Sequence, residues 1–377
     1  MQSGTQNTLV GMTTEEISGT IATELGAPQF RGRQVAEWLY RRMMPGELGG
    51  FEAQFAAMTD LPAGMRVELA ERFSDQPLRL CERHEDSRDG TLKLLARTTQ
   101  GNHPIECVLM PDTNRVSVCL STQAGCPIAC AFCATGTQGL TRNLSAAEIV
   151  SQFQLLQSAS ERRITHVVFM GMGEPLLNYD ATLRAIKILN SECGVAMRHI
   201  TLSTVGIIPN MDRLAAEELQ ITLAVSLHAP TETLRARLVP VAKQYPLSEL
   251  IAACQRYSER THRRLTFEYV LLKGVNDRPE DARALAGLIK RCPAALNIIP
   301  YNPTPVLEEF SRPEAGRIAE FRRILENAGV VVTQRKERGQ QIAAACGQLV
   351  TESSRLRPVK SVLTMAPSSG QTLTGAK

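Results

Sequence analysis

The sequence predicts an α/β protein: a partial (β/α)6 barrel preceded by a small helical domain and a short β-rich extension. Segments with strand composition alternate with helical segments six times between residue 115 and about residue 335. Such alternation is typical of βαβ units with parallel strands. Glycines and polar residues also recur where the predicted strands end. Because the active site of a barrel lies at the carboxyl ends of its strands, both observations favour the same architecture.

The first predicted unit, residues 1–75, is helical. Residues 1–14 have no clear periodicity and are expected to be loose. Two helices are expected between Thr14 and Arg42, with Thr14 as the N-cap and a break at Ala27-Pro28. A third helix is expected near 63–73. Arginines cluster in the second helix, and a cluster of this kind is most often a solvated face.

Residues 76–114 form the predicted β-rich extension. The segments 92–94 and 105–109 have strand composition. A turn signal at Asp89-Gly90 precedes the first segment, and another at 112–114 follows the second. We therefore expect short strands that lead into the barrel.

The predicted barrel spans residues 115–350. Its strands are expected at 115–121, 164–171, 198–204, 220–227, 265–272 and 294–300. Helices are expected between and after them, at about 145–158, 179–191, 208–218, 246–260, 279–291 and 312–328. The remaining residues, 351–377, form a tail that is rich in Ser, Thr and Gly and is expected to be disordered toward its end.

The composition excludes several classes of protein. Of the 377 residues 43% are apolar, as in soluble globular proteins, and a net charge of +4 does not by itself indicate a nucleic-acid binder. No apolar run reaches about 18 residues, so no membrane span is expected, and the N-terminus lacks the features of a signal peptide. Ten cysteines, three of them in one short segment, fit a reducing compartment better than a disulfide scaffold. We expect a cytoplasmic protein.

The most informative motif is the segment GCPIACAFC, which holds Cys126, Cys130 and Cys133. Structural zinc sites are closed by four ligands, and most iron–sulfur clusters take four cysteines. Three thiolates therefore leave a position open for a substrate or a second cofactor. The spacing C-x3-C-x2-C, with Phe132 before the last cysteine, resembles the signature of radical S-adenosylmethionine (SAM) enzymes. In that superfamily the three cysteines hold a [4Fe-4S] cluster and SAM chelates the fourth iron. The alternative is a zinc knuckle or a buried run of cysteines.

Other candidate residues end or follow the later predicted strands. Gly173 lets a ligand approach the backbone closely, and Glu174 beside it offers a carboxylate to a cationic group. The segment resembles the GGE segment of radical SAM enzymes, which contacts the amino group of SAM. Further candidates at strand ends are Ser203, Ser226, Leu227, His228 and Asn302. Each of these residues is equally compatible with a helix cap, a turn or a structural role. Their convergence on one rim of the predicted barrel is what favours a binding site.

From about Phe30 to Val350 the chain resembles the RlmN/Cfr family of radical SAM RNA adenine methyltransferases. The matching segments, in order, are RGRQVAEWLY, IECVLMP, the cysteine segment, FMGMGEPLLN, HITLSTVG, LAVSLHAP, EYVLLKGVND, IIPYNP and AAACGQL. The chain departs from the family pattern inside the cysteine segment, at 128–129 and 131, and at Val205. None of these departures replaces a functional residue.

The resemblance implies a role for each motif residue. Cys126, Cys130 and Cys133 would hold the cluster. The residues that would bind SAM are Gly173, Glu174, Ser203, Ser226, Leu227, His228 and Asn302. Cys346 would carry a methyl group, Cys119 would be its partner thiol and Glu106 would be the general base. For the two cysteines the alternative is a buried, inert thiol.

The family's reaction, carried over to this chain, would consume two SAM molecules per turnover. It would methylate C2 of an adenosine in 23S rRNA and of an anticodon-adjacent adenosine in tRNAs, with a transient Cys119–Cys346 disulfide. The helical domain, with its arginines near Trp38 and Tyr40, would hold an RNA stem. The resemblance also implies an electron donor such as a flavodoxin-type reductase system, and we expect a monomer. The alternatives are methylation of adenine C8 in 23S rRNA, a radical SAM enzyme with a non-RNA substrate, and a non-enzymatic zinc or RNA-binding module.

Overall fold

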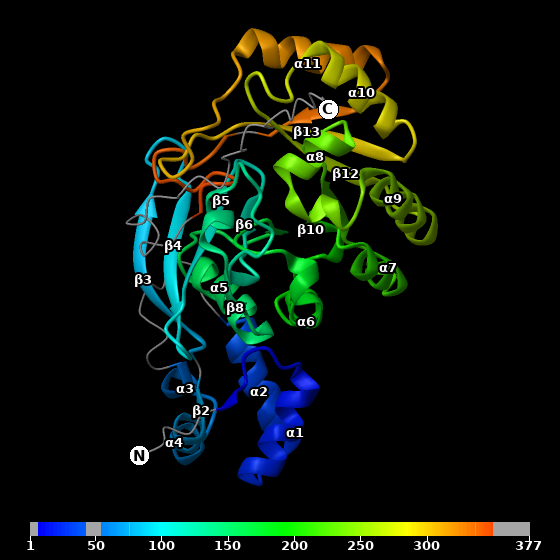
Figure 1. The fold of residues 1–377 in the computed structure, drawn as a ribbon. Coiled ribbons are helices and arrows are strands. Elements are labelled where there is room, and N and C mark those ends of the chain that lie inside the picture. Colours follow the sequence, from blue (N-terminus) through cyan, green and yellow to red (C-terminus); the bar gives the residue numbers. More distant parts are fainter. Residues whose placement is uncertain (1–6, 43–53, 75, 336, 350–377) are drawn as a thin grey trace, which may run out of the picture.

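The computed structural model describes residues 7–42, 54–74, 76–335 and 337–349. Within these ranges ten strands form one sheet, in the order β14-β13-β12-β11-β10-β9-β6-β5-β4-β3 (Figure 1). The parallel strands are β6 (Val116–Cys119), β9 (His166–Phe169), β10 (Ile200–Thr204), β11 (Thr222–Ser226), β12 (Leu265–Leu271), β13 (Ala294–Pro300) and β14 (Val332–Gln334). These parallel strands lie side by side in the sheet in the order in which they occur in the chain, which is the arrangement of an open, partial barrel. The predicted fold class is confirmed.

Helices connect the parallel strands, as predicted. They are α5 (Ala146–Ser158), α6 (Tyr179–Ser191), α7 (Ile208–Ala216), α8 (Glu232–Leu238), α9 (Leu247–Thr261), α10 (Pro279–Ile289) and α11 (Ala315–Asn327). The six predicted strands are all present. Helix α8 and the seventh parallel strand, β14, were not predicted, because elements of seven and three residues are too short to show a periodicity.

The β-rich extension continues the barrel sheet in antiparallel fashion. Its strands are β3 (Leu78–Glu85), β4 (Leu92–Thr98) and β5 (Pro104–Pro111), and β5 pairs with β6. Strand β3 was not predicted, since most of its side chains are exposed or half-buried and polar. Charged side chains and a register shift between Leu80 and Glu82 are features that protect an edge strand from pairing with another chain.

The N-terminal unit is helical, but residues 7–13, where the described part of the chain begins, are not loose. It contains α1 (Thr14–Leu25), α2 (Gln29–Tyr40), α3 (Gln54–Ala57) and α4 (Ala63–Arg72). Strand β1 (Asn7–Thr8) pairs in parallel with β2 (Phe73–Ser74), and Leu9 is fully buried. The expectation of a loose segment is therefore wrong for residues 7–13, because two backbone pairings and a buried leucine fix them. The N-cap is Thr13, in a capping box with Glu16, and not Thr14.

Helices α1 and α2 dock on α5 and α6 of the barrel (Figure 1). The Gln154 side chain of α5 donates to the Leu39 carbonyl at 2.7 Å, and the Thr14 hydroxyl donates to Glu192 at 2.6 Å. A Cβ atom added to Gly11, which has φ +89°, would lie 2.8 Å from the Ala147 nitrogen. This docking explains why nearly every residue of α5 is buried.

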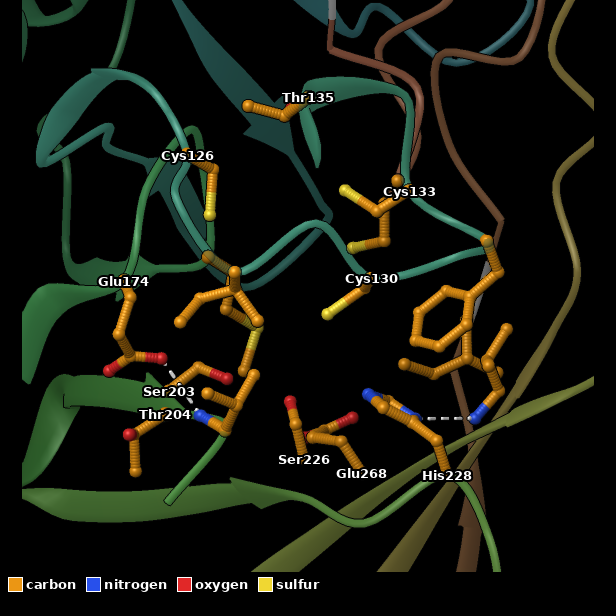
Figure 2. Close-up of a pocket in the computed structure, with 18 of the residues that line it drawn as sticks. Cys126, Cys130, Cys133, Thr135, Glu174, Ser203, Thr204, Ser226, His228 and Glu268 are labelled. Carbon is orange, nitrogen blue, oxygen red and sulfur yellow. Dashed lines mark hydrogen bonds between the residues drawn. The ribbon is translucent and has the colours of Figure 1, made fainter. Parts of the chain in front are cut away.

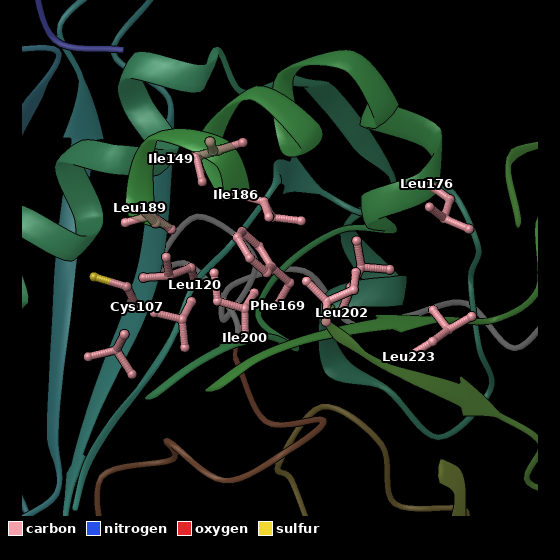
Figure 3. Packing of buried hydrophobic residues seen from close by; sticks show 14 of the residues in the cluster. Cys107, Leu120, Ile149, Phe169, Leu176, Ile186, Leu189, Ile200, Leu202 and Leu223 are labelled. Carbon is pink, nitrogen blue, oxygen red and sulfur yellow. The ribbon is translucent and has the colours of Figure 1, made fainter. Parts of the chain in front are cut away.

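The core beneath the site lies between the sheet and helices α5 and α6 (Figure 3). Along β9 and β10, buried side chains alternate with half-buried ones, because successive side chains of a strand point to opposite faces of the sheet. Figure 3 shows the buried residues Cys107, Leu120, Ile149, Phe169, Leu176, Ile186, Leu189, Ile200, Leu202 and Leu223. No helix in the described ranges is long and apolar enough to cross a membrane. The predicted tail, 351–377, lies outside the described residues.

Candidate active site

A cavity lies at the carboxyl ends of the parallel strands and receives most of the predicted site residues (Figure 2). Its empty space, part of which is open to solvent, is about 920 Å³. The predicted residues that line it are Cys126, Cys130, Cys133, Gly173, Glu174, Ser203, Ser226, His228 and Cys346. The structure thus brings together motifs that are spread over more than half of the chain.

The three cysteines are held on a loop with a fixed base. Strands β7 (Gln123–Gly125) and β8 (Leu140–Asn143) pair at that base, and a 3₁₀ turn spans Ala134–Gln138. The loop is tied at two further points, where the Ala131 N–H donates to the Leu238 carbonyl and the Ala134 N–H donates to the Gly347 carbonyl. Figure 2 shows the sulfur atoms of Cys126, Cys130 and Cys133 turned toward the same space.

Burial makes these thiols poor acids. It raises the pKa of Cys126 to about 12, and the pKa values of Cys130 and Cys133 are raised for the same reason and by their neighbouring thiols. A cationic metal centre reverses this effect, since a coordinating thiol is deprotonated outright. No group of three His, Cys, Asp or Glu side chains in the described residues converges tightly enough for a single metal ion.

Glu174 lies at the end of the turn that follows β9. Its Oε2 accepts the Val205 N–H at 2.8 Å and its Oε1 accepts the Leu176 N–H at 3.0 Å. Burial nevertheless raises the pKa of its carboxyl to about 7, against the lowering effect of these bonds. Gly173 precedes it at φ +100°, and a Cβ atom there would lie 2.6 Å from Gln123, so only glycine fits this turn.

The ends of β10 and β11 contribute Ser203, Ser226 and His228. The ring of His228 is buried, and its Nδ1 accepts the Val270 N–H at 3.1 Å. Burial, with a smaller effect from Arg235, lowers the pKa of His228 to about 3. The ring is therefore neutral, and its proton belongs on Nε2. Phe132 meets the ring edge-on, with centroids 4.7 Å apart.

Two predicted SAM residues do not line this cavity. The Leu227 side chain is fully buried in the core, and its N–H donates to the Glu268 carbonyl at 3.0 Å. Asn302 lines an adjoining cavity, where its Nδ2 donates to the Cys346 carbonyl at 3.2 Å. The Asn302 Oδ1 and the hydroxyl of Tyr301 are buried without a hydrogen-bond partner in the described structure. Both atoms have unused bonding capacity for a ligand.

The adjoining cavity brings Cys119 and Cys346 together. Both residues line it, although they are far apart in the sequence, and Cys346 also lines the larger cavity. Burial raises the pKa of Cys119 to about 12, whereas the Arg335 guanidinium acts in the opposite direction. Arg335 lines both cavities. It is placed to stabilise a thiolate on either cysteine.

Glu106 is on β5, outside the lining of both cavities. It is 3% exposed, and its Oε1 lies 3.0 Å from the Nζ of Lys93, which is 2% exposed. The Ser121 hydroxyl donates to its carbonyl at 2.6 Å. The predicted general base is therefore ion-paired and does not line either cavity.

Sequence reasoning missed two charged residues that line the main cavity. Glu268 is buried on β12, and burial raises the pKa of its carboxyl to about 7. Arg335 follows β14, and the neighbouring Cys346 thiolate raises its pKa. A lone charge inside an otherwise apolar strand, as in LTFEYVL, is the signal that identifies Glu268. Arg335 follows a strand that was not predicted, so its position could not be assigned.

Comparisons with known proteins agree with this site. The model of the ribosomal RNA large subunit methyltransferase N-terminal domain matches residues 7–74, and the model of the radical SAM superfamily matches residues 120–286. The chain is 46% identical over 354 residues to the probable dual-specificity RNA methyltransferase RlmN of Symbiobacterium thermophilum, covering 92% of each chain. It is 47% identical over 362 residues to the corresponding protein of Heliobacterium modesticaldum, covering 92% of this chain and 90% of the relative.

A solved structure is similar over nearly the same length. The crystal structure of a radical SAM methyltransferase from Sphaerobacter thermophilus is 44% identical to this chain, with a TM-score of 0.84, and the match covers 91% of this chain and 98% of that chain. Together with the three-cysteine cavity, these similarities show that the chain belongs to the RlmN family of radical SAM RNA methyltransferases.

Proposed function

We propose that this protein methylates C2 of a specific adenosine in 23S rRNA and of an anticodon-adjacent adenosine in tRNAs. The methyl group would be carried on Cys346, and a transient Cys119–Cys346 disulfide would release the product. The observation that carries the proposal is that Cys346 lines both the three-cysteine cavity and the cavity of Cys119. One sulfur can therefore receive a group on one side and give it up on the other.

Membership of the radical SAM superfamily implies a [4Fe-4S] cluster and SAM, and the cavity fits both. Three thiols line it, together with Tyr301, whose hydroxyl has no hydrogen-bond partner among the described residues. The Asn302 Oδ1, in the adjoining cavity, is likewise without a partner there. Cys126, Cys130 and Cys133 would hold the cluster. SAM would be bound by Gly173, Glu174, Ser203, Ser226, the backbone at Leu227, His228 and Asn302. Bound there, SAM would supply a methyl group, and the cluster with SAM would supply a radical that abstracts hydrogen.

Cys346 would act first as a nucleophile toward the methyl group of one SAM and then present that methyl for hydrogen abstraction, so each turnover would consume two SAM molecules. Adenine C2 lies between two ring nitrogens and is too electron-poor to attack a sulfonium methyl itself. The nucleophile must be a thiolate, and Arg335, which lines the same cavity, supplies a positive charge beside it.

Once the one-carbon radical had joined C2 and the adduct had lost its unpaired electron, the RNA would be bonded to Cys346 in a closed-shell adduct. The acceptor of that electron would be the cluster, which supplies one electron for the cleavage of SAM. The Glu106 carboxylate would accept the ring proton as a general base. Attack by Cys119 on the Cys346 sulfur would then form a disulfide and break the bond between sulfur and carbon, leaving the electron pair on the carbon, which would take up a proton to become the methyl group. Two electrons from an external reductant must restore the two thiols. A flavodoxin-type reductase system is the electron donor that we propose for the reaction.

The N-terminal unit, residues 1–75, would position the RNA. Its α2 helix exposes Phe30, and the Arg31 guanidinium lies 4.9 Å from the centroid of that ring. The guanidinium of Arg42 lies 4.8 Å from the Trp38 ring. Arginines held on aromatic rings suit phosphate contacts, which position a nucleic acid without reading its sequence. We propose that a cytoplasmic monomer acts on an RNA whose target base has left its stack.

The test is anaerobic reconstitution with iron, sulfide, SAM and RNA, followed by mass spectrometry of the digested nucleosides. We expect 2-methyladenosine with the wild-type protein and none with the Cys346→Ala variant. The Cys119→Ala variant should accumulate a covalent protein–RNA adduct through Cys346. If 8-methyladenosine forms instead, the position on the base is wrong. If Cys119→Ala turns over normally, its resolving role is wrong.

A further inference from the structure

A buried lysine connects the candidate general base to the segment that carries Cys346. Lys93, on β4, is 2% exposed, and its Nζ lies 3.0 Å from Oε1 of Glu106. The same Nζ donates to the carbonyl of Ala343 at 3.4 Å. Ala343 is three residues before Cys346. The Lys93 side chain thus contacts both the proposed base, Glu106, and the segment that carries Cys346.

The strand register places these groups on one face of the sheet. Lys93 pairs with Val108, and Val108 pairs with Cys119 on β6. Residues directly opposite each other across an antiparallel pair point to the same side, as do residues two apart along one strand. Lys93, Glu106, Val108 and Cys119 therefore share a face. Val108 and Cys119 also pack in one apolar cluster with Met172 and Leu349.

A buried ion pair adds little net stability to the fold, which favours another role for Lys93 and Glu106. Removing a lysine and a glutamate from water carries a penalty that their mutual attraction only roughly repays. An ionised carboxylate buried without its partner would be far less favourable. A positive charge 3.0 Å from the Glu106 carboxylate favours the ionised form that a base requires, and the 3.4 Å bond to the Ala343 carbonyl ties the Cys346 segment to the same lysine.

We propose that Lys93 is a positioning residue for the reaction, which holds Glu106 ionised and aimed at the face where Cys119 and Cys346 meet. This inference rests on the proposed function, because it requires Glu106 to accept the proton from the RNA adduct. Lys93 itself does not touch the reacting atoms. It acts through Glu106, and this dependence is what an experiment can test.

The experiment is a double-mutant cycle on the holoenzyme, with Lys93→Gln, Glu106→Gln and the variant that carries both. The measured quantity is the single-turnover rate at which RNA is released from its covalent adduct with Cys346. Glu106→Gln should slow release, and Lys93→Gln should slow it by roughly 100-fold, the effect of a misplaced catalytic group. The double variant should be no slower than Glu106→Gln alone, since non-additivity identifies residues that act together. Lys93→Arg keeps the charge and should release RNA at close to the wild-type rate.

Each result has a defined meaning. If Glu106→Gln releases RNA at the wild-type rate, the proposed base is wrong, whatever Lys93 does. If Glu106→Gln is slow while Lys93→Gln is normal, or if the two effects multiply in the double variant, the assignment of Lys93 is overturned. Should Lys93→Gln fail to fold, the double variant, which buries no unpaired charge, still gives the comparison with Glu106→Gln. The matched control is Lys273→Gln, which removes a 3.0 Å ion pair with Glu314 at the surface and should change nothing.

Discussion

The affinity of the protein for SAM should depend on pH through Glu174. Burial raises the pKa of its carboxyl to about 7. The amino group of SAM is bound best by the ionised form, so affinity should fall as the pH drops through 7. About one tenth of the carboxyl is ionised at pH 6 and about nine tenths at pH 8, so the apparent Kd should be roughly tenfold higher at pH 6.

The Glu174→Gln variant removes the charge and keeps the shape. Losing a hydrogen bond to a charged group costs about 1.5–3 kcal/mol, so we expect SAM binding to weaken by roughly 10- to 150-fold and to lose its pH dependence. The assay is equilibrium SAM binding to anaerobically reconstituted protein between pH 6 and 8. Glu268, also buried in this cavity with a pKa raised to about 7, gives the control: the pH dependence should survive in Glu268→Gln.

The same pKa makes a prediction about stability without ligand. The pKa of Glu174 in the folded protein is raised above its ordinary value. Its contribution to the free energy of unfolding is therefore largest at acid pH and is lost as the pH rises through 7. The rise from 4.5 to about 7 corresponds to about 3 kcal/mol. The stability of Glu174→Gln relative to the wild type should therefore increase from pH 4 to pH 8. For SAM binding, the role of Glu174 would be refuted by a wild-type Kd that is equal at pH 6 and pH 8, or by a Glu174→Gln variant that keeps the tenfold change.

Three further substitutions test the geometry. Gly173→Ala should abolish measurable SAM binding, because its Cβ atom would lie 2.6 Å from Gln123 at φ +100°; binding within twofold of wild type would contradict the tight turn. Gly11→Ala should lower the melting temperature by several degrees, a cost of about 1–3 kcal/mol for overpacking against Ala147, whereas the surface variant Gly19→Ala, with open space at its Cβ position, should not. Arg335→Met should slow methylation of the Cys346 thiol, followed by intact-protein mass spectrometry; an unchanged rate would exclude thiolate stabilisation by the guanidinium.

Local patterns in the sequence predicted most of the barrel and the cysteine loop. Alternation of strands and helices is a local signal, and the spacing of Cys126, Cys130 and Cys133 restricts their chemistry before any fold is known. The predictions failed where the local signal is weak or misleading. The polar edge strand β3 and the three-residue β14 have no clear strand pattern, and residues 7–13 are ordered by pairing with β2 and by burial, which depend on a distant part of the chain.

The fold class, the family resemblance and the identity of the thiols can all be read from the order of the residues. Which distant groups meet depends on how the chain packs. Cys119 and Cys346 share a cavity, Lys93 pairs with Glu106, and Arg335 lines both cavities. These contacts join strands, loops and a C-terminal segment that are far apart in the sequence. Separation along the chain does not predict which of them are close in space. Burial, which sets the pKa values of Glu174 and His228, is likewise a property of the packed molecule.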